Sequence, residues 1–225
     1  MENGTQPRRI TLTPAAARVL KAAERLFYER GIHAVGVDLI AAEAGVAKKT
    51  IYDRFGSKEQ IVVEYLAARD ERWREFLAGF LDSAAPDGDP AARLLAVFDA
   101  SRRWARENNS KGCGMVNAHA EISDPSHPAY AVITGQKRWM LALFTDLARE
   151  VAAGTGGTAD GAGAARDAGH ALMLLHEGAL VAHGLRVLPE PFRRAREQAE
   201  RVLEGLYRPV TPTAAEAAGT AGTPG

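Results

Sequence analysis

Cysteine and long apolar runs are scarce in this chain. Cys113 is the single cysteine among 225 residues, so no disulfide can form within the chain and a secreted, disulfide-stapled fold is excluded. No run of about 18 apolar residues occurs, and the polar start has no apolar core of the kind that a signal peptide needs. We therefore expect a cytoplasmic protein without membrane association. A lone cysteine is usually a small buried apolar residue, and a sensor role for Cys113 stays an open alternative.

The motifs of common enzymes and metal sites are also missing. His176 and Glu177 begin like a zinc-peptidase motif, but Leu180 stands where the second histidine is required. His119 and Glu121 form an HxE pair, yet no PCxxC follows to complete a zinc deaminase site. Phosphate-binding glycine loops and the GxSxG of serine hydrolases are absent. The sequence predicts no enzymatic activity, no metal site and no cofactor.

Net charge of either sign is lacking, because 28 Lys and Arg balance 28 Asp and Glu. The whole chain therefore gives no sign of a nucleic-acid partner. The charged side chains are unevenly distributed along the sequence, since residues 8–66 hold ten basic and seven acidic side chains. This local surplus fits a basic DNA-binding domain on an acidic body. The length allows one or two domains with a sizeable core.

The most informative stretch is residues 37–55, VDLIAAEAGVAKKTIYDRF. Apolar positions predict two short helices, and Gly45 between them can take the positive φ that ends the first. Ile51 and Phe55, four residues apart, form the inner face of the second. Its outer face carries Lys, Thr, Tyr and Arg, whose donors suit DNA phosphates and base edges. The alternative is an ordinary helical hairpin with a solvated lysine pair.

Residues 13–66 resemble the amino-terminal DNA-binding domain of the TetR family of transcriptional regulators. The densest match is AGVAKKTIYDRFGSKEQ, where that family usually shows AGVS, a variable pair, T, an aliphatic residue, Y, two variable residues, F and SKE. Two departures stand out. Gly36 replaces the Thr or Ser that commonly caps the first short helix, and Ala47 replaces the Ser that often opens the recognition helix. Each removes an oxygen that can cap a helix and touch phosphate.

Cap signals predict the helices on either side of this motif. Thr13 and Pro14 start a first helix that Gly31 ends. Ser57 with Gln60 has the spacing of a capping box and starts a helix that continues to about residue 82. At about 1.5 Å per residue this helix is long enough to leave the DNA-binding domain and act as a lever on it.

The remaining pattern is helical with interruptions. A loop at 85–90 precedes a helix over 91–108, and another helix covers 129–153. Residues 153–165, AGTGGTADGAGAA, predict a flexible linker. Amphipathic helices follow over 166–188 and 190–207, and the tail 208–225 is predicted to be disordered. The phrase GCGMVNAHAEI, followed by a DPxHP-like turn, also resembles a phrase common in TetR regulatory domains.

The predicted architecture is all-α, with an N-terminal three-helix helix-turn-helix domain and a C-terminal helical domain for ligand binding and dimerisation. Its predicted divisions are a flexible arm at 1–12, the DNA-binding domain at 13–66, the regulatory domain at 67–207 and the tail at 208–225. The resemblance implies a homodimer built as a four-helix bundle from the last two helices of each chain. Packing of those helices within one chain only is the alternative.

Three sets of candidate site residues follow. The DNA-binding set is Lys48, Lys49, Thr50, Tyr52, Arg54, Lys58, Val37, Ala47, Arg8 and Arg9. Candidate lining residues of a mostly apolar ligand pocket are Trp73, Phe76, Phe98, Trp104, Met115, His119, Trp139, Phe144 and His176. The predicted dimer interface holds Leu174, Leu175, Gly178, Ala182, Ala195, Ala199, Val202 and Leu206.

Together these features predict a ligand-responsive transcriptional regulator that binds double-stranded DNA. We expect a repressor that binds a palindromic operator as a homodimer and is released by a small, largely apolar effector. A transcriptional activator, or a regulator that needs no ligand, would use the same residues, so both are alternatives. The remoter alternatives are a helical interaction protein or an enzyme without DNA binding. The sequence identifies neither the effector nor the operator.

Overall fold

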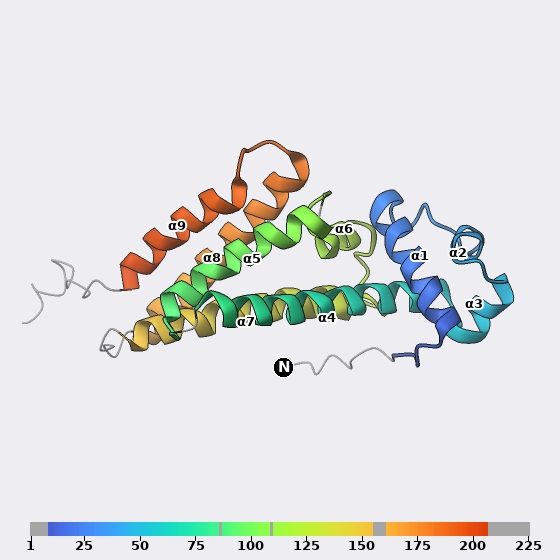
Figure 1. The fold of residues 1–225 in the computed structure, drawn as a ribbon, viewed down its shortest axis with the longest axis horizontal. Coiled ribbons are helices and arrows are strands. Elements are labelled where there is room, and N and C mark those ends of the chain that lie inside the picture. Colours follow the sequence, from blue (N-terminus) through green and yellow to red (C-terminus); the bar gives the residue numbers. More distant parts are fainter. Residues whose placement is uncertain (1–8, 86, 109, 155–160, 207–225) are drawn as a thin grey trace, which may run out of the picture.

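The computed structural model describes residues 9–85, 87–108, 110–154 and 161–206, and within these ranges the chain forms nine α-helices and no strand (Figure 1). This confirms the predicted all-α class. The helices are α1 (Pro14–Arg30), α2 (Val37–Ala44), α3 (Lys48–Phe55), α4 (Lys58–Ala84), α5 (Pro90–Asn108), α6 (Gly114–Glu121), α7 (Tyr130–Ala153), α8 (Gly161–Leu185) and α9 (Pro191–Leu206). Predictions for Arg8, Tyr207 and the tail 208–225 lie outside the described residues.

Local caps set the boundaries of the first four helices. The Thr13 hydroxyl accepts a hydrogen bond from the amide of Ala16 at 3.3 Å, and Ser57 Oγ accepts one from Gln60 at 3.2 Å. Gly45 takes the left-handed conformation, with φ 62° and ψ 42°, and ends α2. The predicted starts of α1 and α4 and the predicted turn between α2 and α3 are therefore confirmed.

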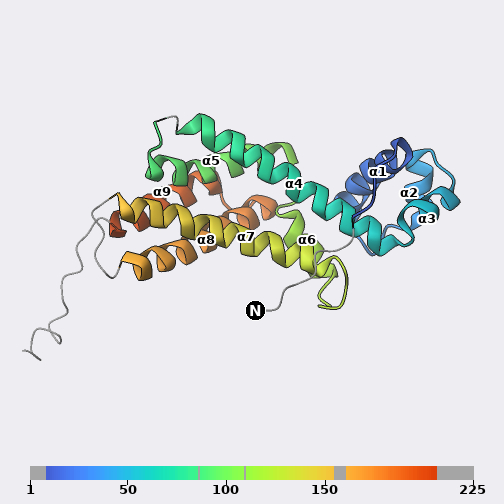
Figure 2. The ribbon, with the colours of Figure 1, turned by 90° about the horizontal axis from the view of Figure 1, so that it is seen from below.

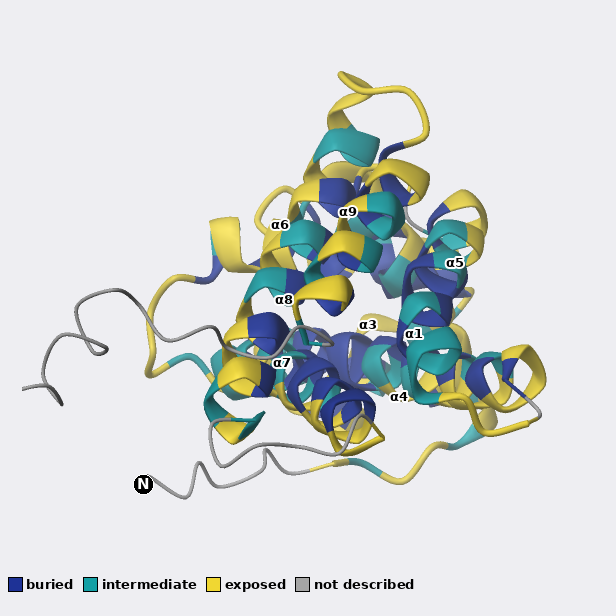
Figure 3. Cartoon of the chain, turned by 90° about the vertical axis from the view of Figure 1, so that its left-hand side faces the viewer, coloured by how far each residue is buried: buried dark blue, intermediate teal, exposed yellow. Residues whose placement is uncertain are grey.

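The helices build two hydrophobic cores that share α4. The first core gathers α1, α2, α3 and the start of α4 as far as Leu66, and α6 and the start of α7 also contribute to it. The second begins at Trp73 of α4 and is completed by α5, α7, α8 and α9. Figure 2 shows α4 running from the group α1–α3 into the larger helical body. In Figure 3 the buried segments lie where helices meet, and the outer turns are exposed.

Hydrogen bonds join α1 to the region around α6. The Tyr28 hydroxyl donates to the carbonyl of Gly112 at 3.0 Å and accepts from the amide of Lys111 at 2.8 Å. The Glu121 carboxylate accepts from the amides of Ile32 and His33 at 2.8 and 2.7 Å. The bonds from Ile32 and His33 satisfy backbone amides just past the end of α1. Together these contacts hold the group α1–α3 against the helical body at more than one point.

The predicted linker at 153–165 is wrong at its carboxyl end. Residues 161–165 form the first turns of α8, and Ala165 is fully buried. Small residues there allow close packing on α7, and this burial outweighs their weak helix propensity. Helix α8 also ends at Leu185, three residues before the predicted end, and Arg186 follows it with a φ of 57°. None of the helices in the described ranges combines the length and apolar character needed to span a membrane.

The contact between α7 and α8 depends on Gly169. A Cβ atom placed there would lie 2.5 Å from Thr145 Oγ1 and 2.8 Å from Thr145 Cα, and backbone cannot move aside cheaply. We predict that Gly169→Ala lowers the free energy of unfolding by about 1–3 kcal/mol. Gly79 is the matched control, because it lies exposed inside α4 with no atom within 4 Å of an added Cβ. Gly79→Ala should raise stability by up to about 1 kcal/mol. Urea titration of both variants tests this, and equal effects would contradict the packing described.

Candidate nucleic-acid interface and ligand pocket

Helix α3 presents a polar outer face on a buried inner one. Ile51 and Phe55 are buried in the first core, as predicted. On the opposite face Lys48, Lys49 and Arg54 are exposed, and the Tyr52 ring is 46% exposed. A large aromatic side chain left in solvent beside three basic groups has no role in the monomer core. This face is therefore free to contact another molecule.

Acidic neighbours hold both lysines of α3 in the free protein. Lys48 Nζ lies 2.8 Å from Asp38 Oδ1 on α2, and this hydrogen bond raises the pKa of Lys48. Lys49 Nζ lies 2.7 Å from Asp53 Oδ2 one turn along the same helix. Exposed pairs of this kind contribute little to stability, so a phosphate can replace the carboxylate at low cost.

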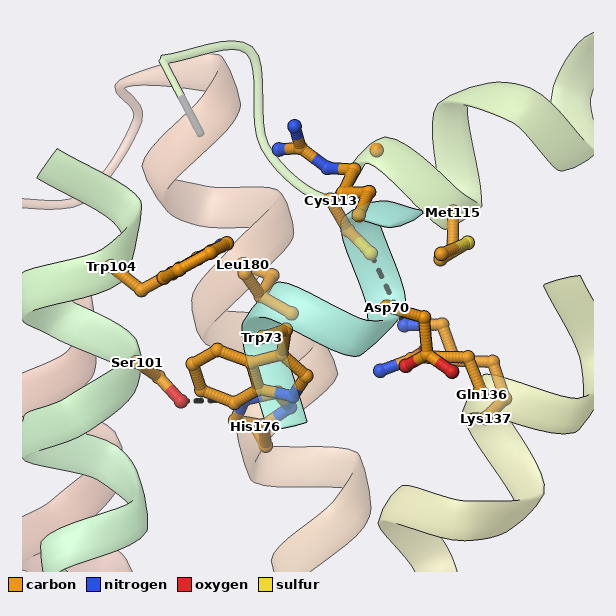
Figure 4. Close-up of a pocket in the computed structure, with 12 residues that line it drawn as sticks. Asp70, Trp73, Ser101, Trp104, Cys113, Met115, Gln136, Lys137, His176 and Leu180 are labelled. Carbon is orange, nitrogen blue, oxygen red and sulfur yellow. Dashed lines mark hydrogen bonds between the residues drawn. The ribbon is translucent and has the colours of Figure 1, made fainter. Parts of the chain in front are cut away.

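A pocket lies in the helical body, bounded by five separate parts of the chain (Figure 4). Its cavity volume is about 50 Å³, which corresponds to roughly three to five waters. The lining is mixed, with more apolar than polar surface. It consists of Arg69, Asp70 and Trp73 of α4, Ser101 and Trp104 of α5, Cys113, Gly114 and Met115 at the start of α6, Gln136 and Lys137 of α7, and His176 and Leu180 of α8.

The aromatic wall of the pocket comes from α4 and α5. The rings of Trp73 and Trp104 meet edge to face with centroids 5.6 Å apart, and Phe76 lies behind them, 5.2 Å from Trp104. The Trp73 indole N–H donates to Met140 Sδ at 3.4 Å. Both indoles are held in place, so they offer a pre-formed apolar surface to a ligand.

Lys137 and Glu177 form a half-buried ion pair at the pocket. Lys137 Nζ donates to the two Glu177 carboxylate oxygens at 2.8 and 2.9 Å and to Cys113 Sγ at 3.2 Å. Burial lowers the pKa of Lys137, but the attraction of Cys113 and Glu177 outweighs it and the pKa is raised. Burial alone would raise the pKa of Glu177, but contact with His176 and Lys137 lowers it to about 2. Both groups are therefore charged at neutral pH.

His176 lies deep in the second core beside the pocket. Its Nε2 lies 2.9 Å from Ser101 Oγ, and its ring contacts Phe98 and Phe144 with centroids 6.2 and 5.6 Å apart. Burial lowers the pKa of His176, so the imidazole is neutral at neutral pH. In the described part of the chain, no group of three or more His, Cys, Asp or Glu is placed to hold a metal ion.

Comparison with known proteins agrees with this geometry. The family model for bacterial regulatory proteins of the tetR family matches residues 19–65. A TetR-family transcriptional regulator of Streptomyces coelicolor has 31% sequence identity and a TM-score of 0.76, with 88% of this chain and 92% of that chain aligned. The chain belongs to the TetR family of transcriptional regulators. Members of this family regulate transcription and are not enzymes, in agreement with the missing catalytic motifs.

Two curated TetR-type relatives are named for opposite effects on transcription, one as an activator and one as a repressor. The transcriptional activator FasR of Mycolicibacterium smegmatis is 31% identical over 108 residues, which are 48% of each chain. The transcriptional repressor KstR2 of Mycobacterium tuberculosis is 36% identical over 87 residues, 37% of this chain and 40% of that one. The matches thus span about half the length of these curated relatives or less.

Two predicted DNA contacts of this TetR chain are placed elsewhere by the structure. Val37 is 9% exposed and belongs to the first core, because the first residue of α2 turns its side chain inward. Arg9 pairs with Glu64 at 2.9 Å and with Glu71, so it ties the chain before α1 to α4. Ala47 is exposed, and Thr50 and Lys58 are half-buried. Arg8 lies outside the described residues.

The predicted ligand residues divide into three groups. Trp73, Trp104, Met115 and His176 line the pocket. Phe76 lies behind the indoles, and Phe98 and Phe144 are fully buried core residues. His119 and Trp139 lie away from it: His119 is exposed beside Tyr130, and Trp139 packs under Arg74 in a groove between α4 and α7. The prediction missed the polar lining, Arg69, Asp70, Ser101, Gln136 and Lys137, because long-range packing of separate helices places it.

The residues predicted for the dimer interface differ in how far they are exposed in the single chain. Leu174 is 74% exposed, Gly178 is exposed, and Leu175 and Ala182 are half-buried on α8. On α9, Ala195 and Ala199 are 7% and 0% exposed, because they pack on the core of their own chain. These two were wrongly assigned to a dimer surface. Val202 and Leu206 are half-buried against the same core.

The lowered pKa of Glu177 has a measurable consequence. A carboxylate with a depressed folded-state pKa stabilises the fold above its ordinary pKa, and this stabilisation is lost as pH falls from 4.5 to about 2. We predict that wild type is more stable than Glu177→Gln at neutral pH by up to about 3 kcal/mol, and that this difference shrinks across that window. Exposed Glu107, substituted in the same way, is the control. Chemical denaturation at several pH values tests this, and a pH-independent difference would contradict it.

Proposed function

We propose that the protein is a ligand-responsive repressor that binds a palindromic operator as a homodimer through α3. The observation that carries this proposal is the exposed basic and aromatic face of α3, joined by the continuous helix α4 to a separate pocket. Two copies of α3 would enter successive major grooves on one face of the DNA. Selection of binding sites from random duplex DNA by the purified protein tests the proposal, and the absence of any palindromic consensus would contradict it.

Repression is the sign of regulation that we propose. Transcription from a promoter that carries the selected operator, measured with and without the protein, tests the sign. Repression gives less transcript when the protein is present and recovery when an effector is added. More transcript on addition of the protein would assign activation instead.

Arg69 connects the proposed effector site to the DNA-binding domain. It lines the pocket, and its guanidinium donates to the carbonyl of Asn108 at 2.7 Å. The same group lies 3.7 Å from Glu24 and 4.8 Å above the Tyr28 ring, both on α1. A ligand that displaces Arg69 would change contacts on the helix that supports the DNA-binding motif. Such a ligand shifts the protein away from the DNA-binding arrangement only if it binds that state less tightly.

The outer face of α8 supports the proposed homodimer. Leu174, Val181 and Leu185 are 74%, 48% and 67% exposed, and Val187 just beyond the helix is 71% exposed. These apolar side chains continue along one side of α8 with Gly178 between them, where a second helix can approach closely. Such an apolar strip is typical of an interface between subunits.

Substitutions on α3 and α2 should change operator affinity in opposite directions. Lys48→Ala removes one phosphate partner, so we predict roughly tenfold weaker binding and a salt slope smaller by about one. Asp38→Asn releases Lys48 from its ion pair and removes a negative charge, so binding should strengthen. Titration of the selected duplex at several salt concentrations measures both effects. Arg103→Ala, at an exposed position on α5, is the control, and equal effects of all three would contradict contact through α3.

A charge on the α8 strip should separate the subunits. We predict that Leu174→Glu turns the dimer into a monomer, because the dimer would bury an unpaired carboxylate. Leu12→Glu is the matched control, since Leu12 is an exposed leucine, at 56%, outside this strip. Analytical ultracentrifugation of the three proteins measures the mass in solution. A dimeric Leu174→Glu variant, or a monomeric wild type, would show that this face is not the interface.

A further inference from the structure

The polar atoms of the pocket are unequally satisfied. Among the described residues, three buried side-chain atoms lack a hydrogen-bond partner: Asp70 Oδ1, Gln136 Oε1 and His176 Nδ1. All three residues line this one pocket. His176 Nδ1 faces Glu177 Oε1 at 3.5 Å, which leaves the oxygens of Asp70 and Gln136 as the two atoms without a hydrogen-bond partner. An unpaired buried acceptor costs about 1–3 kcal/mol, so two of them in one cavity indicate a place where a ligand supplies the missing donors.

The two cationic side chains of the pocket are already engaged. Lys137 directs its ammonium to Glu177 and Cys113, and Arg69 directs its guanidinium to Asn108 and Glu24. The Trp73 N–H is bonded to Met140. An anionic ligand would therefore have to break existing contacts, whereas a ligand that brings N–H or O–H groups would not.

Asp70 combines an open acceptor with a charge. Its Oδ2 accepts from Arg74 at 2.9 Å, and its side chain is 13% exposed. Arg74 lies on the far side, stacked over the Trp139 ring at 4.2 Å, in the groove between α4 and α7. Asp70 and Gln136 line both this groove and the pocket, so they lie between the two.

The opposite wall suits a cation or an aromatic ring. Trp73 and Trp104 meet edge to face at 5.6 Å. Indole faces attract ammonium groups through the ring quadrupole and also pack well against other rings. The negatively polarised faces of these rings do not attract a carboxylate.

We propose that the effector of this pocket is a small amine with an aromatic or apolar body. Its N–H groups bind Asp70 Oδ1 and Gln136 Oε1, and its body packs against Trp73 and Trp104. The inference rests on the proposed ligand-responsive function and names the chemical class of the ligand. The cavity volume of about 50 Å³ is smaller than the roughly 150 Å³ of a protein cavity that holds benzene, so an effector with an aromatic body enters only when lining side chains move.

Calorimetric titration of the protein without DNA, using benzylamine, benzyl alcohol and benzoate, tests the ligand class. These probes share a ring and differ in charge. We expect benzylamine to bind most tightly, benzyl alcohol more weakly and benzoate not measurably. Tighter binding of benzoate, or no binding of benzylamine at millimolar concentration, overturns the proposal. Because no DNA is present, the result is independent of whether the protein binds an operator.

One variant and a matched control locate the binding site. Asp70→Asn should weaken benzylamine about tenfold or more, because a charge-assisted hydrogen bond is lost. The same change should alter benzyl alcohol binding far less, since Asn still offers an oxygen. Asp82→Asn, an exposed carboxylate on α4 that faces Arg93, should leave both unchanged. Equal loss in the two variants, or none in Asp70→Asn, overturns the assignment of the site.

Gln136→Leu gives a readout that a purely structural role would not produce. Because the Gln136 oxygen is buried without a partner, an apolar side chain of similar size should raise the melting temperature of the ligand-free protein. The same variant should bind benzylamine more weakly. A lower melting temperature would show that the amide is satisfied within the protein and would overturn the proposal.

Discussion

Helix α4 is the constraint on which the rest of the structure depends. Leu66 and Trp73 lie seven residues apart on it, yet they belong to different hydrophobic cores. Because α4 is one continuous helix, a displacement of its carboxyl-terminal half in the helical body also displaces its amino-terminal end in the DNA-binding domain, unless the helix bends. The hydrogen bonds of Tyr28 and Glu121 add a second connection between the same two regions. The orientation of α3 thus depends on how α4 and α6 pack around the pocket.

The side chains around the pocket are not packed for stability alone. A core filled with apolar side chains would be more stable than one that buries Asp70 and Gln136 with unpaired oxygens. The Lys137 and Glu177 pair also carries a desolvation cost that its hydrogen bonds must offset. Polar groups concentrated in one cavity are what a binding site requires, because they distinguish one ligand from another.

Much of the fold follows from local sequence, and the pocket does not. The caps at Thr13, Gly45 and Ser57 act within a few residues, so the boundaries that depend on them were predictable. The start of α8 was missed because burial of Ala165 against other helices overrides local propensity. The helix-turn-helix was recognised from consecutive residues, but Val37 shows that exposure of one side chain depends on how that unit packs.

The polar lining of the pocket lay beyond sequence analysis for a related reason. Lys137 and Glu177 are forty positions apart, and only the packing of α7 on α8 brings them to 2.8 Å.

The most direct test of the central claim, that two copies of α3 bind one operator, is a hydroxyl-radical footprint on the selected duplex. Two protected regions on one face of the DNA, about one helical turn apart, are the predicted result. A single protected region, or protection that survives replacement of both Lys48 and Tyr52, would contradict the account.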